Sequence, residues 1–162
     1  MQVDARSKTT PAALDARFKA SREVSDLQRA FIDANTLAQS MHDELERVGK
    51  LLNEGPEHAS LKEMKSAREA LSKKVSQARD KLKGGWGGPR FRIFDLAGQL
   101  QASTAGPTEA QMRTLEQLTA DVTVTIGTLN RIATVDFPAF EKTTAGVVSP
   151  ILKPVRLPGR GQ

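Results

Sequence analysis

The chain contains no cysteine and no tyrosine, and its aromatic residues are one tryptophan and six phenylalanines. The missing thiol excludes disulfides, thiolate nucleophiles and cysteine-ligated zinc together. No apolar run approaches the ~18 residues that a membrane span requires, and no signal-peptide core appears, so we expect no membrane-spanning segment. A Gly-x-Ser-x-Gly motif is also absent, and no Ser/His/Asp group can be placed together, so nucleophilic catalysis has no candidate residue.

Histidine occurs only twice, which leaves little material for a metal site. His42 and Glu46 are four residues apart and would share one helix face, but a single pair cannot close a metal site. A solvated helix surface explains the surrounding acidic residues as well, and His58 is expected to be a surface residue. We therefore expect no catalytic residue, no cofactor and no metal.

The positive charge of the chain is small and unevenly distributed. The 162 residues carry 24 Lys and Arg against 19 Asp and Glu, a formal net charge of +5. Residues 142–162 hold four basic side chains and no acidic one, whereas 11–57 holds six basic and nine acidic side chains, and 58–92 holds ten and three. Neighbouring segments of opposite sign predict two helices packed against each other rather than two separate binding surfaces.

Apolar residues recur at spacings of three and four over most of the chain, which predicts an all-α fold. Thr10 and Pro11 have the form of an N-cap and a first helical residue, and a long helix should run from there to an Asn-Glu-Gly-Pro stop at 53–56. A second helix ends near residue 83. Because the connection is short, we expect a long antiparallel αα-hairpin over 11–83, with one end projecting beyond its neighbours. Arg68 falls on the apolar seam and is expected to reach its edge.

A Gly-Gly-Trp-Gly-Gly-Pro segment at 84–89 interrupts the helices. No strand precedes it and no Gly-Lys-Ser/Thr follows it, so it is not a phosphate-binding loop. We expect Trp86 to fold back onto the bundle, with an exposed partner contact as the alternative.

Residues 90–140 predict a shorter helix pair packed on part of the hairpin. Thr108 and Gln111 have the spacing of a capping box, and the β-branched run at 122–126 is expected to be helical because an isolated strand would have no partner. This helix should end near Phe137 and Pro138. The residues expected in the core are Phe31, Leu45, Leu71, Phe94, Leu115 and Ile126.

A proline-rich basic tail occupies 141–162, and residues 1–10 form a separate leading segment. The tail is expected to be extended, and the apolar residues of its first half could lie along the bundle. The residues expected to contact a partner are Trp86, Lys153, Arg156 and Arg160.

Two function classes remain. One is a structural or interaction domain, in which heptad spacing would permit a homodimer without determining it. The other is a coiled-coil-like protein that binds nucleic acid or another anionic partner through the helix at 58–92 and the tail. The second class is disfavoured because an acidic helix is available to the basic one, and the aromatic residues fall mostly at apolar positions.

Several short motifs carry a likeness to known proteins. The leading segment reads Val-Asp-Ala-Arg-Ser-Lys-Thr-Thr at 3–10. The further motifs are Leu-Asp-Ala-Arg-Phe at 14–18, the glycine-rich break, Leu-Ala-Gly-Gln-Leu at 96–100, Ala-Gly-Pro-Thr at 105–108, Leu-Asn at 129–130 and Phe-Pro-Ala-Phe at 137–140. Over most of 1–145 these resemble the C-terminal helical region of large bacterial proteins with sortilin-like, BNR-type β-propeller repeats. That family usually reads Met-Asp-Pro-Arg-Val-Lys-Thr where its small β-sandwich domain ends, so Ala5 and Ser7 depart from the pattern.

The resemblance implies an exported, periplasmic or extracellular protein, although this chain carries no signal peptide and a cytoplasmic location stays open. Family members are called glycosyl hydrolase- or sialidase-like because of their propellers, and no propeller repeat is present here. Sialidases use a tyrosine nucleophile, which this chain lacks. The resemblance therefore implies a non-catalytic structural or interaction domain, whose partner is the propeller or β-sandwich part of a parent protein. Because Met1 stands so close to the strand-exit sequence, we expect a fragment or a split-off C-terminal domain.

Overall fold

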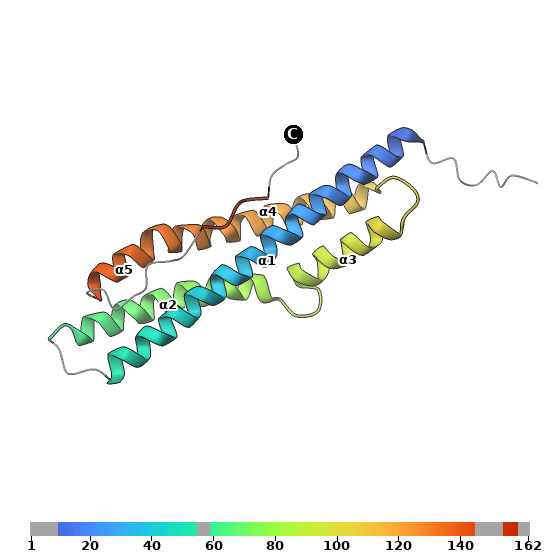
Figure 1. Cartoon of the computed structure of the whole chain (residues 1–162). Coiled ribbons are helices and arrows are strands. Elements are labelled where there is room, and N and C mark those ends of the chain that lie inside the picture. Colours follow the sequence, from blue (N-terminus) through green and yellow to red (C-terminus); the bar gives the residue numbers. More distant parts are fainter. Residues whose placement is uncertain (1–9, 55–58, 145–153, 159–162) are drawn as a thin grey trace, which may run out of the picture.

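Three helical segments lie side by side, each antiparallel to the one before it along the chain, in the structure, a computed structural model that describes residues 10–54, 59–144 and 154–158 (Figure 1). The first segment is one long helix, the second is broken into two helices, and the third contains a π-helical turn. The elements are α1 (Pro11–Glu54), α2 (Leu61–Lys83), α3 (Pro89–Ala102), α4 (Glu109–Arg131), η1 (Ile132–Asp136) and α5 (Phe137–Thr143). The described residues form no strand, which confirms the all-α fold.

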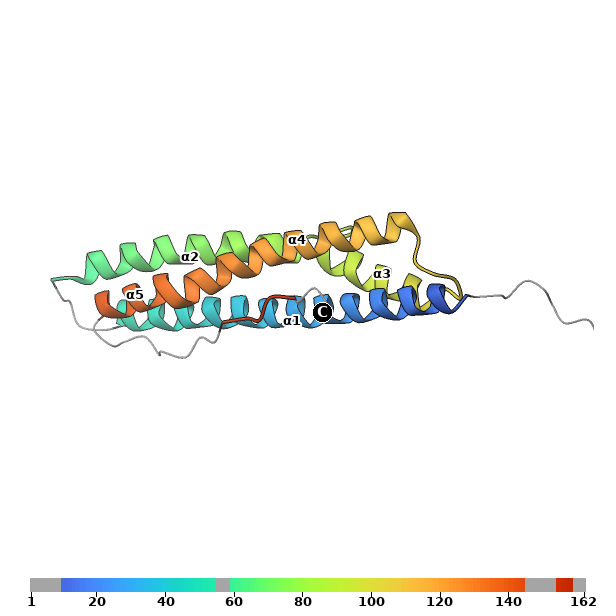
Figure 2. The same ribbon diagram turned by 90° about the horizontal axis from the view of Figure 1, so that it is seen from above.

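The predicted antiparallel hairpin is present, since α2 runs back along α1, but it is shorter than expected and the chain continues from it along a different path. With 23 residues against the 44 of α1, α2 covers only about half of the long helix. After the turn at 84–88 the chain does not reverse, and α3 continues along the other half of α1 (Figure 2). The expected projecting end is wrong, because Arg17 of α1 donates a hydrogen bond to the carbonyl of Ser103 beyond α3, and Gly106 lies against Ala13.

One continuous apolar core runs through the bundle. All but one of the expected core residues are buried: Phe31, Leu45, Leu71, Leu115 and Ile126. The prediction for Phe94 is wrong, since its side chain is 45% exposed while Ile93 and Leu96 face inward. Because α3 carries large apolar residues on a second side of the helix as well, periodicity does not single out its buried face.

The predicted helix starts are confirmed. Thr10 Oγ1 accepts a hydrogen bond from the Ala13 N–H at 3.2 Å, so it caps α1. The capping box of α4 is complete, with the Gln111 N–H donating to Thr108 Oγ1 at 3.2 Å and the Thr108 N–H donating to Gln111 Oε1 at 2.9 Å. The β-branched run at 122–126 is helical within α4.

The predicted helix end near Phe137 and Pro138 is wrong. The third segment continues through α5 to Thr143. The π turn η1 ends two residues before Pro138, and the Phe137 N–H donates to the carbonyl of Ile132, five residues back. A wider turn relieves the clash that proline would make with a carbonyl four residues earlier in a regular α-helix.

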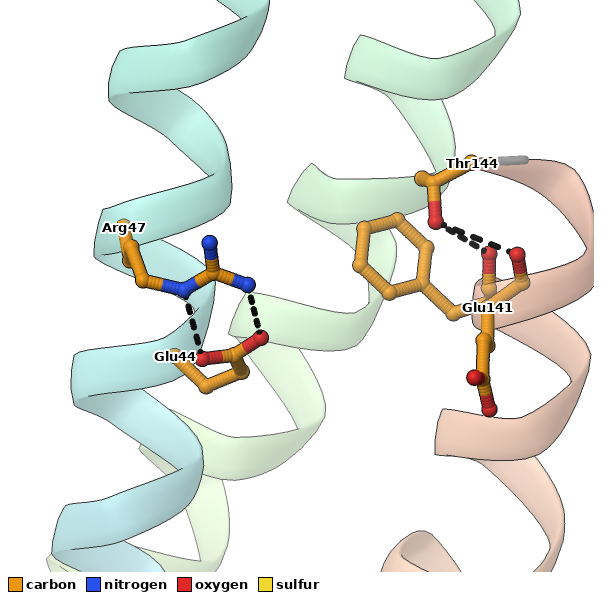
Figure 3. A network of polar contacts seen from close by, with 5 residues as sticks. Glu44, Arg47, Glu141 and Thr144 are labelled. Carbon is orange, nitrogen blue, oxygen red and sulfur yellow. Dashed lines mark hydrogen bonds and ion pairs between the residues drawn. The ribbon is translucent and has the colours of Figure 1, made fainter. Parts of the chain in front are cut away.

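Opposite charges meet across the interface between α1 and α2 at Arg68 and Glu46. Arg68 of α2 reaches Glu46 of α1 at only 3.7 Å. Within α1, Arg47 forms a two-pronged pair with Glu44, through Nε at 2.9 Å and Nη2 at 2.6 Å, and these hydrogen bonds raise the pKa of Arg47 (Figure 3). Exposed pairs are worth about 0–1 kcal/mol each, so the apolar seam holds the two helices together.

Candidate partner-binding surfaces

The turn between α2 and α3 presents the tryptophan to solvent. Trp86 is 96% exposed, and its ring centroid lies 5.2 Å from that of Phe91 with a 37° tilt between the rings. The prediction that Trp86 folds back onto the bundle is therefore wrong, since its side chain is exposed. The alternative, a contact with a partner, stays a prediction.

Glycine backbones explain this outward position. The Gly88 N–H donates to the carbonyl of Gly85 at 2.8 Å, which closes a tight turn around residues 86 and 87. Gly87 has φ +87°, a left-handed conformation that favours glycine. A Cβ at Gly88 would lie 2.0 Å from the carbonyl oxygen of Gly84, so the two ends of the turn touch through their backbones. The turn consequently points its one large side chain away from the core.

Phe91 and Phe94 extend this surface along α3. They are 46% and 45% exposed and lie three residues apart, on one side of the helix. We call Trp86, Phe91 and Phe94 the aromatic patch. Sequence reasoning named only Trp86; the signal for the two phenylalanines was that α3 carries more apolar residues than one buried face can hold.

The tail supplies a second surface element. Among the residues expected to contact a partner, Arg156 is exposed, and Lys153 and Arg160 lie outside the described residues. Val155 is buried, and both of its backbone polar groups bond to the side chain of Asn130 on α4. The tail segment 154–158 lies against α1 and α4, away from the turn between α2 and α3, so the structure does not bring Arg156 and Trp86 together (Figures 1 and 2).

The first half of the tail, which the sequence placed along the bundle, falls mostly outside the described residues. The last described residue before the gap is Thr144, which follows α5 and is fully buried. Its hydroxyl donates to the carbonyls of Phe140 and Glu141 at 3.0 and 3.3 Å (Figure 3). This hydroxyl completes a helix end and is shielded from solvent, so it offers no nucleophile.

The two histidines were the remaining candidate metal ligands in the sequence. His42 is half-buried, and His58 lies outside the described residues. Within the described ranges, no three histidine, aspartate or glutamate side chains gather closely enough to hold a metal ion. Over those same ranges, none of the helices combines the length and apolar character needed to cross a bilayer.

No protein-family model, curated protein or solved structure matches the chain. The fold and its surfaces therefore define it as an all-α helical bundle with an exposed aromatic patch and a docked tail segment.

Proposed function

We propose that the chain is a non-catalytic interaction domain, which binds a protein partner through the aromatic patch. The observation that carries this proposal is the 96% exposure of Trp86 beside two half-exposed phenylalanines. Tryptophan and phenylalanine each bury roughly 150–250 Å² at interfaces, and tryptophan is enriched among the residues that dominate binding energy. The patch combines one projecting anchor with two flanking rings on a helix, so it fits an apolar pocket on a partner.

Positive charge near the aromatic patch predicts the charge of the partner's pocket. Lys83 and Arg90 are exposed on either side of the turn. A partner pocket with carboxylates at its rim would match them, and such rim charges influence association rate and specificity more than affinity.

The candidate partner comes from the resemblance of the short sequence motifs to the C-terminal helical region of sortilin-like, BNR-type propeller proteins. On this proposal, the patch contacts the propeller or β-sandwich part of a parent protein in the periplasm or outside the cell. The support for it is the order of the short motifs between residues 3 and 140, together with the helical fold on which most of them lie.

A second candidate function is binding of a single-stranded nucleic acid. It is favoured by the order Lys83, Trp86, Arg90, Phe91, in which exposed basic residues and exposed rings alternate along the chain. Bases stack on aromatic rings while basic groups contact phosphates, and the binding then weakens steeply with salt.

The experiment measures binding of the full chain to two labelled probes, a propeller and β-sandwich segment of a protein from that family, and an oligo-dT strand. We expect the protein probe to bind, and Trp86→Ala to weaken it by about thirtyfold, the equivalent of about 2 kcal/mol. Phe18→Ala is the matched control, because Phe18 is 70% exposed on α1 and lies outside the patch; it should leave the affinity unchanged.

Equal binding by the wild type and Trp86→Ala would refute the proposed role of the patch. Tight, salt-sensitive binding of the oligonucleotide without binding of the protein probe would replace the first candidate with the second. Turnover of a fluorogenic glycoside by the purified chain would contradict the non-catalytic assignment.

A further inference from the structure

Asn130 binds the tail in the way that a β-strand binds its neighbour. Its Nδ2 donates to the carbonyl of Val155 at 2.8 Å, and its Oδ1 accepts from the Val155 N–H at 2.7 Å. One side-chain amide thus satisfies both backbone groups of one residue, as the paired residue does in an antiparallel ladder. This contact recognises extended backbone whatever the side chain, while the burial of Val155 adds a preference for a small aliphatic group.

A groove continues from the docked tail between α1 and α4. Its volume is about 1250 Å³, and Pro158 stands at the end where the described tail stops. The lining runs from Ala12 to Glu23 on α1 and from Met112 to Val124 on α4, about 18 Å along each helix at ~1.5 Å per residue. That length accommodates roughly five to six extended residues at about 3.3 Å each. The volume exceeds the roughly 300–1,000 Å³ of small-molecule sites, so the groove suits a length of chain.

The lining also specifies the chemistry of that chain. Ala16, Ala20 and Leu115 make the surface apolar and shallow, which favours small aliphatic groups over aromatic rings. Glu23 and Glu116 contribute two carboxylates against the single ammonium group of Lys19. This balance favours a positively charged side chain beyond the anchor. Because Val155 bonds to Asn130 and Pro158 lines the groove near Val124, the docked segment runs antiparallel to α4, and a longer ligand would enter the groove with its C-terminal part.

We propose that the groove between α1 and α4 is a docking site for an extended peptide of a partner protein, with an aliphatic residue held at Asn130 and a basic residue beyond it. The chain's own segment 154–158 is the internal ligand of this site. A partner peptide must displace it, so the apparent affinity is lowered by the fraction of molecules in which the tail is docked. The site is separate from the aromatic patch and does not depend on the function proposed for it.

The test uses the full-length chain and a fluorescent peptide with the sequence of residues 153–160, Lys-Pro-Val-Arg-Leu-Pro-Gly-Arg. Val155→Asp in the protein places a charge at the buried anchor position and releases the internal ligand. We expect this variant to bind the peptide saturably and about tenfold more tightly than the wild type, because the competition is removed. Adding Asn130→Ala should weaken the binding about tenfold or more, since both backbone bonds are lost.

Changes in the peptide give a readout that cannot arise from misfolding of the protein. Methylating the Val155 amide nitrogen of the peptide removes the donor to Asn130 Oδ1, and binding should fall about tenfold. Methylating the Leu157 nitrogen is the matched control and should have little effect. Equal binding of the two methylated peptides, or no saturable binding by the Val155→Asp variant, would overturn the proposal. Dimerisation of the wild type that Val155→Asp abolishes would overturn it as well, because the occupant would then be a second copy of this chain.

Discussion

Arg68 lies on the inner seam of α2, where its guanidinium group crosses α1 at Gly49. A Cβ at Gly49 would be 2.1 Å from Arg68 Nη1, so the glycine provides the space that the guanidinium fills. The Arg68 side chain is 24% exposed, and its Nε has no hydrogen-bond partner within the described part of the chain. The expectation that it reaches the edge of the seam holds for Nη2, which faces Glu46, but not for Nε. Leaving a buried N–H unpaired destabilises the fold by about 1–3 kcal/mol. This exceeds the stabilisation that an ion pair at 3.7 Å provides.

We therefore expect Arg68→Met to raise the free energy of unfolding by about 1 kcal/mol, because methionine fills the seam without a polar atom that needs a partner. Urea unfolding followed by circular dichroism measures the change. Lys73→Met, at an exposed position of the same helix, should stay within about 0.5 kcal/mol of the wild type. A loss of stability in Arg68→Met would show that the contact with Glu46 outweighs the unpaired Nε.

Among the elements, η1 shows how a local irregularity keeps a helix continuous. A π turn holds one residue more than the α-turn that it replaces, and here it precedes Pro138. Phe137 and Phe140, just beyond it, are both buried. Removing one residue would restore regular α-helical bonding and leave α5 in its present orientation, but it would place Pro138 inside an unbroken helix.

Deleting Val135, which is 55% exposed, should destabilise the chain by about 3 kcal/mol, the cost of proline in a helix interior. Combining the deletion with Pro138→Ala should recover most of that loss, because the remaining helix is then regular. Pro138→Ala alone is the control, and thermal unfolding of the three variants provides the comparison. If the double variant is no more stable than the deletion, the π turn has a role other than accommodating the proline.

For the molecule as a whole, the turn at 84–88 decides the architecture. It lets α3 continue past the end of α2, so two helices together cover the length of α1 (Figure 1). The close approach of Gly88 to Gly84 sets the angle between α2 and α3, and that angle also places the aromatic patch.

Gly88→Ala should lower the free energy of unfolding by more than about 1 kcal/mol, because its Cβ would meet the backbone oxygen of Gly84 at 2.0 Å. Gly85→Ala is the matched control, since a Cβ there meets nothing within 4 Å, and it should be neutral or slightly stabilising. Chemical unfolding measures stability, and quenching of the fluorescence of Trp86 reports whether the patch has moved. Equal stability of the two variants would contradict the close contact between the ends of the turn.

The sequence by itself determined the features that neighbouring residues create. Spacing of apolar residues gave the helical fold and most of the core, and Thr10, Thr108 and Gln111 marked helix starts through bonds that span three residues. These interactions form within one turn of chain, so their residue types suffice to predict them. The same local reasoning failed at Pro138, where a wider turn replaces the expected helix end.

Only the tertiary structure decided the features that depend on contacts between residues far apart in the sequence. The path after the glycine-rich turn and the exposed side of Phe94 follow from where the space along α1 is already filled. Arg17 bonds to Ser103 across 86 positions, and Asn130 holds Val155 across 25. Many pairings at such separations are compatible with one apolar pattern, and the packing of all helices together selects among them.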